Sequence, residues 1–143
     1  MVDTLRCLPW TDPPAELPEG EGARRKPGPI YDLAAVQKIV DGDHIYVATE
    51  NCSQDVEKLE WDVDDVAQLI ADLLPGDYRN SEWCRSSRGH VSDADVYRLD
   101  YDTAAMCRGV RWKHKRLYLK FGARHNDPRL TIWVFSCHPP RLS

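Results

Sequence analysis

Two kinds of hydrophobic spacing divide the chain. Between residues 32 and 74 apolar side chains recur every three or four positions, which is typical of an α-helix, whereas beyond residue 94 they alternate with polar ones, which is typical of a half-buried β-strand. Before residue 30 no apolar period is present, and six of the ten prolines lie there. The sequence therefore predicts an extended N-terminal arm over residues 1–29 and a folded domain over residues 30–143.

Helices are expected in the first half of the domain. Asp32 and Asp62 can cap two longer helices, and Ser53 can cap a brief one between them. The dipeptide Pro75-Gly76 ends the last helix, and residues 44–48 form a short strand or extended piece. Acidic residues in the first turn of the last helix favour its dipole, so they are not expected to bind a metal.

Strands are expected in the second half. Three strand-like runs lie at residues 95–101, 116–124 and 130–138, with connections short enough for an antiparallel meander. The polar segment 76–92 has no period and is expected to be irregular. Helices followed by strands predict an α+β domain, with the helices packed on one face of an antiparallel sheet.

The outer face of one strand has the most suggestive chemistry. Successive side chains of a strand point to opposite faces, so Arg116, Tyr118 and Lys120 should stand in line while their apolar neighbours face the core. Two cations and a phenol suit a phosphate backbone and a stacked base. An ordinary solvated strand face is the alternative.

Composition narrows the class of protein. The 143 residues suit one domain, and no apolar run approaches the roughly 18 residues of a membrane helix. No signal peptide is recognised, and five scattered cysteines without a Cys-x-x-Cys pair suit a reduced, cytoplasmic protein. No metal site or cofactor is expected, because no spacing of ligands supports one.

The net charge of −4 hides an asymmetry between the two parts of the chain. Residues 1–75 contain 6 Lys and Arg against 16 Asp and Glu, whereas residues 76–143 contain 13 against 7. The basic C-terminal part suits nucleic acid or an acidic protein partner. Alternatively, the two parts neutralise each other within one domain.

A series of short motifs resembles the MqsR family of bacterial toxins, which are mRNA interferases. Each motif alone is weak, but their order and spacing match the family across about three quarters of the chain. The motifs are Tyr31-Asp32-Leu33 with Val36, Asp62-Val63-Asp64, Asp77-Tyr78-Arg79-Asn80-Ser81, Asp95-Val96-Tyr97, Tyr118-Leu119-Lys120 and Val134-Phe135-Ser136-Cys137-His138.

The resemblance implies a RelE-like fold and the toxin of a toxin–antitoxin system. Such a toxin is a metal-independent endoribonuclease that cleaves mRNA, with or without the ribosome, and arrests growth until a cognate antitoxin protein neutralises it. A catalytically weak module of the same fold, which binds RNA, the ribosome or a protein, is the alternative. The family's tyrosine is kept as Tyr118, and its last lysine becomes His138. Its other lysine falls on Asn80, or on Arg79 with a one-residue shift, and its glutamine becomes Ala94.

The residues also suggest how such a reaction would work. Metal-free RNA cleavage needs a base for the 2′-hydroxyl, an acid for the leaving 5′-oxygen, and cations for the phosphate. His138 is the candidate for proton transfer, Lys120 and Arg79 for charge stabilisation, and Tyr118 for stacking, hydrogen bonding or proton transfer. The candidate RNA-binding residues are Tyr97, Arg111, Lys113, His114, Lys115 and Arg116. A solvated loop is the alternative for the basic run.

Overall fold

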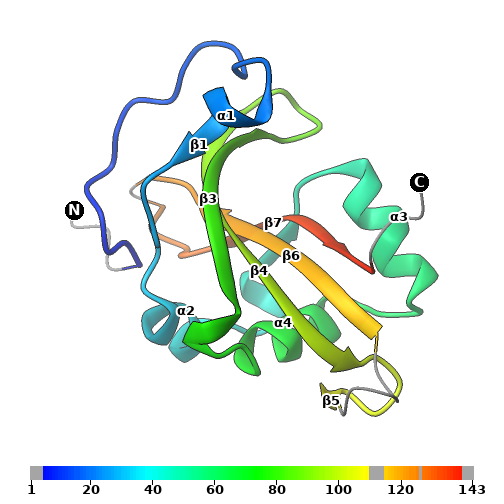
Figure 1. Cartoon of the computed structure of the whole chain (residues 1–143). Coiled ribbons are helices and arrows are strands. Elements are labelled where there is room, and N and C mark those ends of the chain that lie inside the picture. Colours follow the sequence, from blue (N-terminus) through cyan, green and yellow to red (C-terminus); the bar gives the residue numbers. More distant parts are fainter. Residues whose placement is uncertain (1–4, 110–114, 126, 140–143) are drawn as a thin grey trace.

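A mixed sheet of seven strands forms the centre of the part of the chain that the computed structural model describes, residues 5–109, 115–125 and 127–139 (Figure 1). The strands are β1 (Arg25–Lys26), β2 (Ile45–Val47), β3 (Tyr78–Arg85), β4 (Val91–Asp102), β5 (Cys107–Arg108), β6 (Lys115–Ala123) and β7 (Ile132–His138). Their order is β1-β3-β4-β6-β7-β2, and β5 pairs with β4. The β2–β7 pair is parallel, and the other described pairs are antiparallel. The α+β prediction is confirmed.

The helices lie in the N-terminal half. They are α1 (Glu21–Arg24), α2 (Leu33–Ile39), α3 (Glu50–Lys58) and α4 (Val63–Ala71), with 3-10 turns η1 (Gly42–His44) and η2 (Pro75–Asp77). Three of them are expected from the sequence; α1 and β1 are not, because they lie in the arm of residues 1–29 that is expected to be extended throughout. Asp32 caps α2 by accepting from the Ala35 N–H. Asp62 and Asp65 form a capping box at the start of α4. Both predicted caps are therefore confirmed, but the predicted lengths are not, because α2 has 7 residues and α3, which is expected to be brief, has 9.

The cap of α3 differs from the prediction. Thr49, not Ser53, begins the helix, because its hydroxyl oxygen accepts from the Cys52 N–H at 3.0 Å. The same hydroxyl donates to the Phe135 carbonyl at 2.9 Å and so ties the start of α3 to β7. Ser53 lies inside the helix and is exposed.

Strand β3 is the largest departure from the sequence prediction, which made residues 76–92 irregular. It pairs with β4 along most of its length, with a bulge between Tyr78 and Asn80. Its polar residues are compatible with burial because they find partners: the buried Ser81 hydroxyl donates to Asp95 at 2.6 Å. The three strands expected farther along are confirmed as β4, β6 and β7.

One face of the sheet faces the main hydrophobic core. Leu99, Leu117, Leu119 and Phe121 are buried there and form one cluster with apolar residues of the helices. The helical members of that cluster include Val36, Val56, Val66, Leu69 and Ile70. Figure 1 shows α2 and α4 below the sheet and α3 beside β7.

The N-terminal arm lies along the β3 side of the sheet (Figure 1). Leu5 is buried in the core, and Arg6 reaches Asp93 at 2.6 Å. Asp93 also receives Lys26 at 3.3 Å and the Tyr31 hydroxyl at 2.6 Å. Burial raises the pKa of Asp93, but the hydrogen bonds from Arg6 and Tyr31 and the two cations outweigh it, so the pKa lies below its usual range. This network attaches the arm to the domain.

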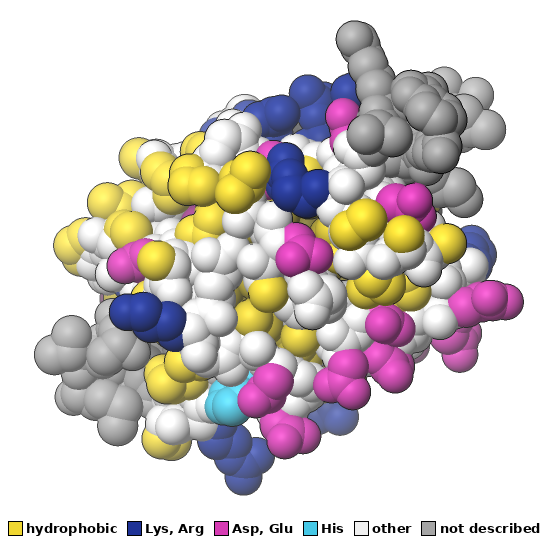
Figure 2. Space-filling view, turned by 90° about the horizontal axis from the view of Figure 1, so that it is seen from below, with side chains coloured by type: hydrophobic (Ala, Val, Ile, Leu, Met, Phe, Trp, Pro, Cys, Tyr) yellow, Lys and Arg dark blue, Asp and Glu magenta, His cyan; other side chains and the backbone are white. Residues whose placement is uncertain are grey.

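Exposed acidic side chains of the N-terminal half lie near the start of η1 and the start of α4. In the view from below, most of the acidic side chains lie toward the bottom and lower right (Figure 2). Asp41 and Asp43 flank the start of η1, Asp62 and Asp64 lie at the start of α4, and all four are exposed. No helix within the described residues is both long enough and apolar enough to cross a membrane.

Candidate functional site

Strands β6 and β7 place three of the predicted catalytic side chains on the sheet face opposite the main core. Tyr118 pairs with His138, and Lys120 pairs with Ser136. Paired residues of an antiparallel ladder point to the same face, so these four side chains share one surface. They line a hollow of about 390 Å³, whose lining residues are Glu82, Val96, Tyr118, Leu119, Lys120, Ser136 and His138.

Lys120 is held at this hollow by an acidic partner. Its Nζ lies 3.5 Å from Glu82 Oε2, and both side chains are about one-fifth exposed. The other Glu82 oxygen accepts from the Asn80 side-chain amide at 3.2 Å. An ammonium group has three donors. The single carboxylate contact therefore leaves Lys120 with donors for an anionic ligand.

The hydrogen bond of His138 determines which ring nitrogen can act as a base. Its Nδ1 lies 2.6 Å from the Pro139 carbonyl oxygen. A carbonyl only accepts, so the proton of this bond belongs to Nδ1. The Nε2 atom of the neutral ring then has the free lone pair. The ring centroid of His138 lies 5.8 Å from that of Tyr118.

A second cation stands beside Tyr118. Arg98 on β4 pairs with Tyr118 on β6, and its guanidinium carbon lies 6.0 Å from the centre of the phenol ring. Sequence reasoning did not assign a role to Arg98, Glu82 or Ser136. The alternation within residues 95–101 could have identified Arg98, because it has the same parity as Val96, on the face opposite the core.

Arg79 does not join this group. It is the extra residue of the β3 bulge, it is exposed, and it does not line the hollow. Its Nη1 donates to the Gly76 and Tyr78 carbonyl oxygens, at 3.0 Å each. The hollow therefore brings together three of the four predicted catalytic residues.

The predicted RNA-binding residues have different outcomes. Tyr97 is 2% exposed and stacks on Phe121 at 5.6 Å, and burial raises the pKa of its phenol. Its assignment to RNA binding is therefore wrong, because its parity along β4 directs it into the core. Arg116 is half exposed and lies 3.4 Å from Asp100, and Lys115 pairs with Tyr101. Arg111, Lys113 and His114 lie outside the described residues.

A second hollow of about 340 Å³ adjoins the first. The two share Glu82, Lys120, Ser136 and His138. The N-terminal arm supplies Leu17 and Arg24 to the second hollow, and α3 supplies Cys52 and Asp55. Burial, and to a smaller extent the charge of Asp55, raise the pKa of the Cys52 thiol to about 12, so this thiol is no ready nucleophile near neutral pH.

The described residues include no group of three or more His, Cys, Asp or Glu side chains placed to hold a metal ion. Comparisons with protein-family models, with curated proteins and with solved structures gave no match. The geometry of the hollow and the sequence motifs are therefore the observations from which a function is argued.

Proposed function

We propose that this protein is the toxin of a toxin–antitoxin system, a metal-independent endoribonuclease that cleaves mRNA and arrests growth. One observation carries the proposal: Tyr118, Lys120 and His138 meet in one hollow on the open face of the sheet. A histidine, a phenol and an ammonium group can supply the base, the acid and the cation that this reaction requires. A RelE-like fold, which the motif resemblance implies, is part of the proposal.

In the proposed reaction, His138 begins the cleavage. Its Nε2 removes the proton of a ribose 2′-hydroxyl, and the 2′-oxygen forms a bond to the adjacent phosphorus. The bond from phosphorus to the 5′-oxygen breaks, and Tyr118 supplies the proton that this oxygen takes. The products are a 2′,3′-cyclic phosphate and a 5′-hydroxyl. The hydrogen bond to Pro139, which leaves Nε2 unprotonated in the neutral ring, supports this role for His138.

Two cations are assigned to the negative charge that develops on the phosphate. Lys120 lies in the hollow itself, and Arg98 lies beside Tyr118. We assign to Arg98 the charge-stabilising role for which the sequence offered Arg79, because Arg79 is bound to carbonyl groups outside the hollow. Glu82 positions Lys120 and is displaced from it in part when phosphate binds.

The proposal includes partners and a compartment. The substrate is mRNA, so the site of action is the cytoplasm, and a cognate antitoxin protein neutralises the toxin by contact. No cofactor is assigned. The ion pair between Lys120 and Glu82 favours one second candidate, a catalytically weak module that binds RNA, the ribosome or a protein, because Glu82 competes with phosphate for the ammonium group.

A cleavage assay in EDTA tests the proposal and separates the two candidates. The purified protein is incubated with a defined RNA, and the end groups of the products are identified. We expect 2′,3′-cyclic phosphate and 5′-hydroxyl ends, and loss of cleavage in Lys120→Ala but not in Lys38→Ala, which changes an exposed lysine of α2. Binding without cleavage would favour the second candidate, and cleavage only with added metal would overturn the proposed chemistry.

A further inference from the structure

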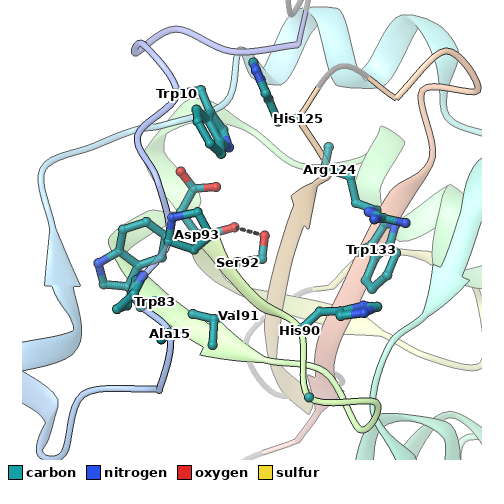
Figure 3. A pocket seen from close by; sticks show the side chains of 14 residues that line it. Trp10, Ala15, Trp83, His90, Val91, Ser92, Asp93, Arg124, His125 and Trp133 are labelled. Carbon is teal, nitrogen blue, oxygen red and sulfur yellow. Dashed lines mark hydrogen bonds between the residues drawn. The ribbon is translucent and has the colours of Figure 1, made fainter.

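A cleft other than the two hollows described above lies where the N-terminal arm meets the ends of β3, β4 and β6 (Figure 3). Three tryptophans from separate segments line this cleft of about 410 Å³: Trp10 from the arm, Trp83 from β3 and Trp133 from β7. Two histidines, His90 and His125, also line it. Its volume is within the range of small-molecule and cofactor sites.

The cleft continues into a neighbouring hollow of about 600 Å³. The two share His90, Arg124, His125 and Trp133, so they form one groove. This neighbouring hollow adds cationic and aromatic residues, among them Tyr46, Arg88 and Arg129. We call the combined surface the tryptophan groove.

Cations dominate the tryptophan groove. Within residues 5–109, 115–125 and 127–139, no acidic side chain pairs with Arg88, Arg124 or Arg129. All three arginines are exposed. By contrast, Arg108 of β5 lies 2.6 Å from Asp77. The groove therefore has guanidinium groups available for an anionic ligand.

The acidic residues of the groove already have partners. Asp93 lies 2.6 Å from Arg6 and 3.3 Å from Lys26, so its charge is compensated. The Asp127 carboxylate accepts backbone N–H groups of Arg129 at 2.9 Å and Thr131 at 3.2 Å. These contacts weaken the repulsion that a carboxylate would exert on a bound phosphate.

The aromatic rings of the groove are arranged for stacking. The guanidinium of Arg124 lies 5.5 Å over the Trp133 ring, and Figure 3 shows the two next to each other on one wall. On the facing wall, Trp10 stacks on His125 at 4.2 Å with an interplanar angle of 14°, and it is 37% exposed. Stacked rings beside guanidinium groups hold unpaired bases in many RNA-binding proteins.

We propose that the tryptophan groove binds single-stranded RNA. Its bases stack on Trp10 and Trp133, and its phosphates contact Arg88, Arg124 and Arg129. An acidic peptide would satisfy the arginines, but its carboxylates offer no ring to the tryptophans. The aromatic lining therefore favours nucleic acid over an acidic protein partner.

The groove and the catalytic hollow share one face of the sheet. Trp133 pairs with Gly122, which is two residues from Lys120 and has the same parity. Trp133 and His138 are five residues apart along β7, or roughly 16 Å at the usual rise of a strand. One RNA strand can therefore reach both sites. This deepens the proposed function and rests on it, since the groove would hold the RNA on one side of the cleaved bond.

The test measures binding in a way that does not depend on cleavage. The probe is a fluorescein-labelled 12-nucleotide RNA with 2′-O-methyl groups throughout, which removes the attacking hydroxyl. Anisotropy is recorded in EDTA at several salt concentrations. We expect Arg124→Gln/Arg129→Gln to weaken binding about tenfold or more and to reduce the slope of log K against log salt by about 1.4, or about 0.7 for each phosphate contact.

A second variant tests stacking. Trp10→Leu, in the arm, should weaken binding by about five- to a hundredfold with little change in the salt slope. The matched control is Lys38→Gln/Lys58→Gln, which removes two exposed cations of α2 and α3 and should leave binding unchanged. Circular dichroism and thermal unfolding establish that each variant is folded.

Each outcome supports or overturns the inference. Unchanged binding in both groove variants would overturn it, as would tighter binding of a polyglutamate of equal charge than of the RNA. Groove-dependent RNA binding by a protein that cleaves no RNA would support the inference while the proposed function fails. Cleavage that needs Lys120, combined with groove variants that bind RNA normally, would leave the proposed function standing and remove the groove from it.

Discussion

Tyr118 and His138 lie directly opposite each other on β6 and β7, with ring centroids 5.8 Å apart. Two residues later, between the pairs Lys120–Ser136 and Phe121–Val134, a bulge changes the register of the two strands. Because of this bulge, Trp133 also lies on the face that carries Lys120 and His138, although the simple parity of β7 would have put it on the opposite face. One irregularity therefore joins the catalytic hollow and the tryptophan groove on one surface.

Replacing His138 tests proton transfer. His138→Gln keeps a polar side chain but removes the exchangeable proton, so cleavage should slow by on the order of a hundredfold to ten-thousandfold. A proton exchanged by His138 makes the cleavage rate depend on pH, and this dependence should disappear in the variant. Single-turnover cleavage of one RNA across pH, in EDTA, measures both effects.

The control for this variant is RNA binding. A neutral side chain adds little to phosphate affinity, so His138→Gln should bind the 2′-O-methyl RNA as the unchanged protein does. If the folded variant keeps the same pH profile, the proton is transferred by another group, and Tyr118→Phe becomes the next variant to measure.

Replacing Lys120 tests charge stabilisation. Loss of one donor to the transition state commonly costs about 3 kcal/mol, so Lys120→Ala should slow cleavage on the order of a hundredfold and relieve growth arrest on induction in bacteria. Equal toxicity of a folded, equally abundant Lys120→Ala protein would exclude this role for the lysine.

Glu82→Gln removes the carboxylate that competes for Lys120 and should tighten RNA binding.

The sequence predicts the elements that have strong local signals, and it fails where distant partners decide. The caps Asp32 and Asp62 act within one helical turn. In β6, the alternation of apolar and polar residues indicates directly which side chains are buried. The burial of Ser81 in β3, in contrast, depends on Asp95, which lies on another strand. A polar segment of this kind has no apolar period from which a strand could be recognised.

The candidate site divides in the same way. The alternation along β6 predicts that Tyr118 and Lys120 share a face, and the structure confirms it. The alternation along β4 also indicates that Tyr97 is buried. The assignment of Tyr97 to RNA binding was wrong because it relied on the ability of a phenol ring to stack on a base and not on this alternation. The place of Arg79 could not be predicted, because it depends on a bulge that has no clear sequence signal.

The start of α3 provides a stability test in which sequence and structure disagree. Thr49→Ala removes the acceptor for the Cys52 N–H and the donor to Phe135, so it should lower the free energy of unfolding by about 1–2 kcal/mol. Ser53→Ala, at an exposed position inside the helix, should change it by less than about 0.5 kcal/mol. Urea denaturation of both variants measures the difference, and a larger loss for Ser53→Ala would contradict the assigned cap.

The attachment of the N-terminal arm provides a pH-dependent test. Asp93→Asn removes the charge that Arg6 and Lys26 share, and loss of one partner of a buried pair should lower the free energy of unfolding by about 3 kcal/mol at pH 7. The pKa of Asp93 is lowered in the folded protein, so its contribution is complete above the ordinary aspartate value of about 3.9 and is lost as the pH falls through the lower, folded value. The difference in the free energy of unfolding between the unchanged protein and Asp93→Asn should therefore be constant above about pH 5 and become smaller below about pH 4.

Urea denaturation of both proteins from pH 2 to pH 7 measures this difference. Asp12→Asn, an exposed position of the same arm, is the matched control and should show no difference from the unchanged protein at any pH. In Asp93→Asn the arm also loses its ionic attachment, so proteolysis between residues 11 and 23 should become faster while the sheet stays protected. A difference that becomes larger as the pH falls would mean that the folded protein favours protonated Asp93, and the ionic attachment of the arm would then be rejected.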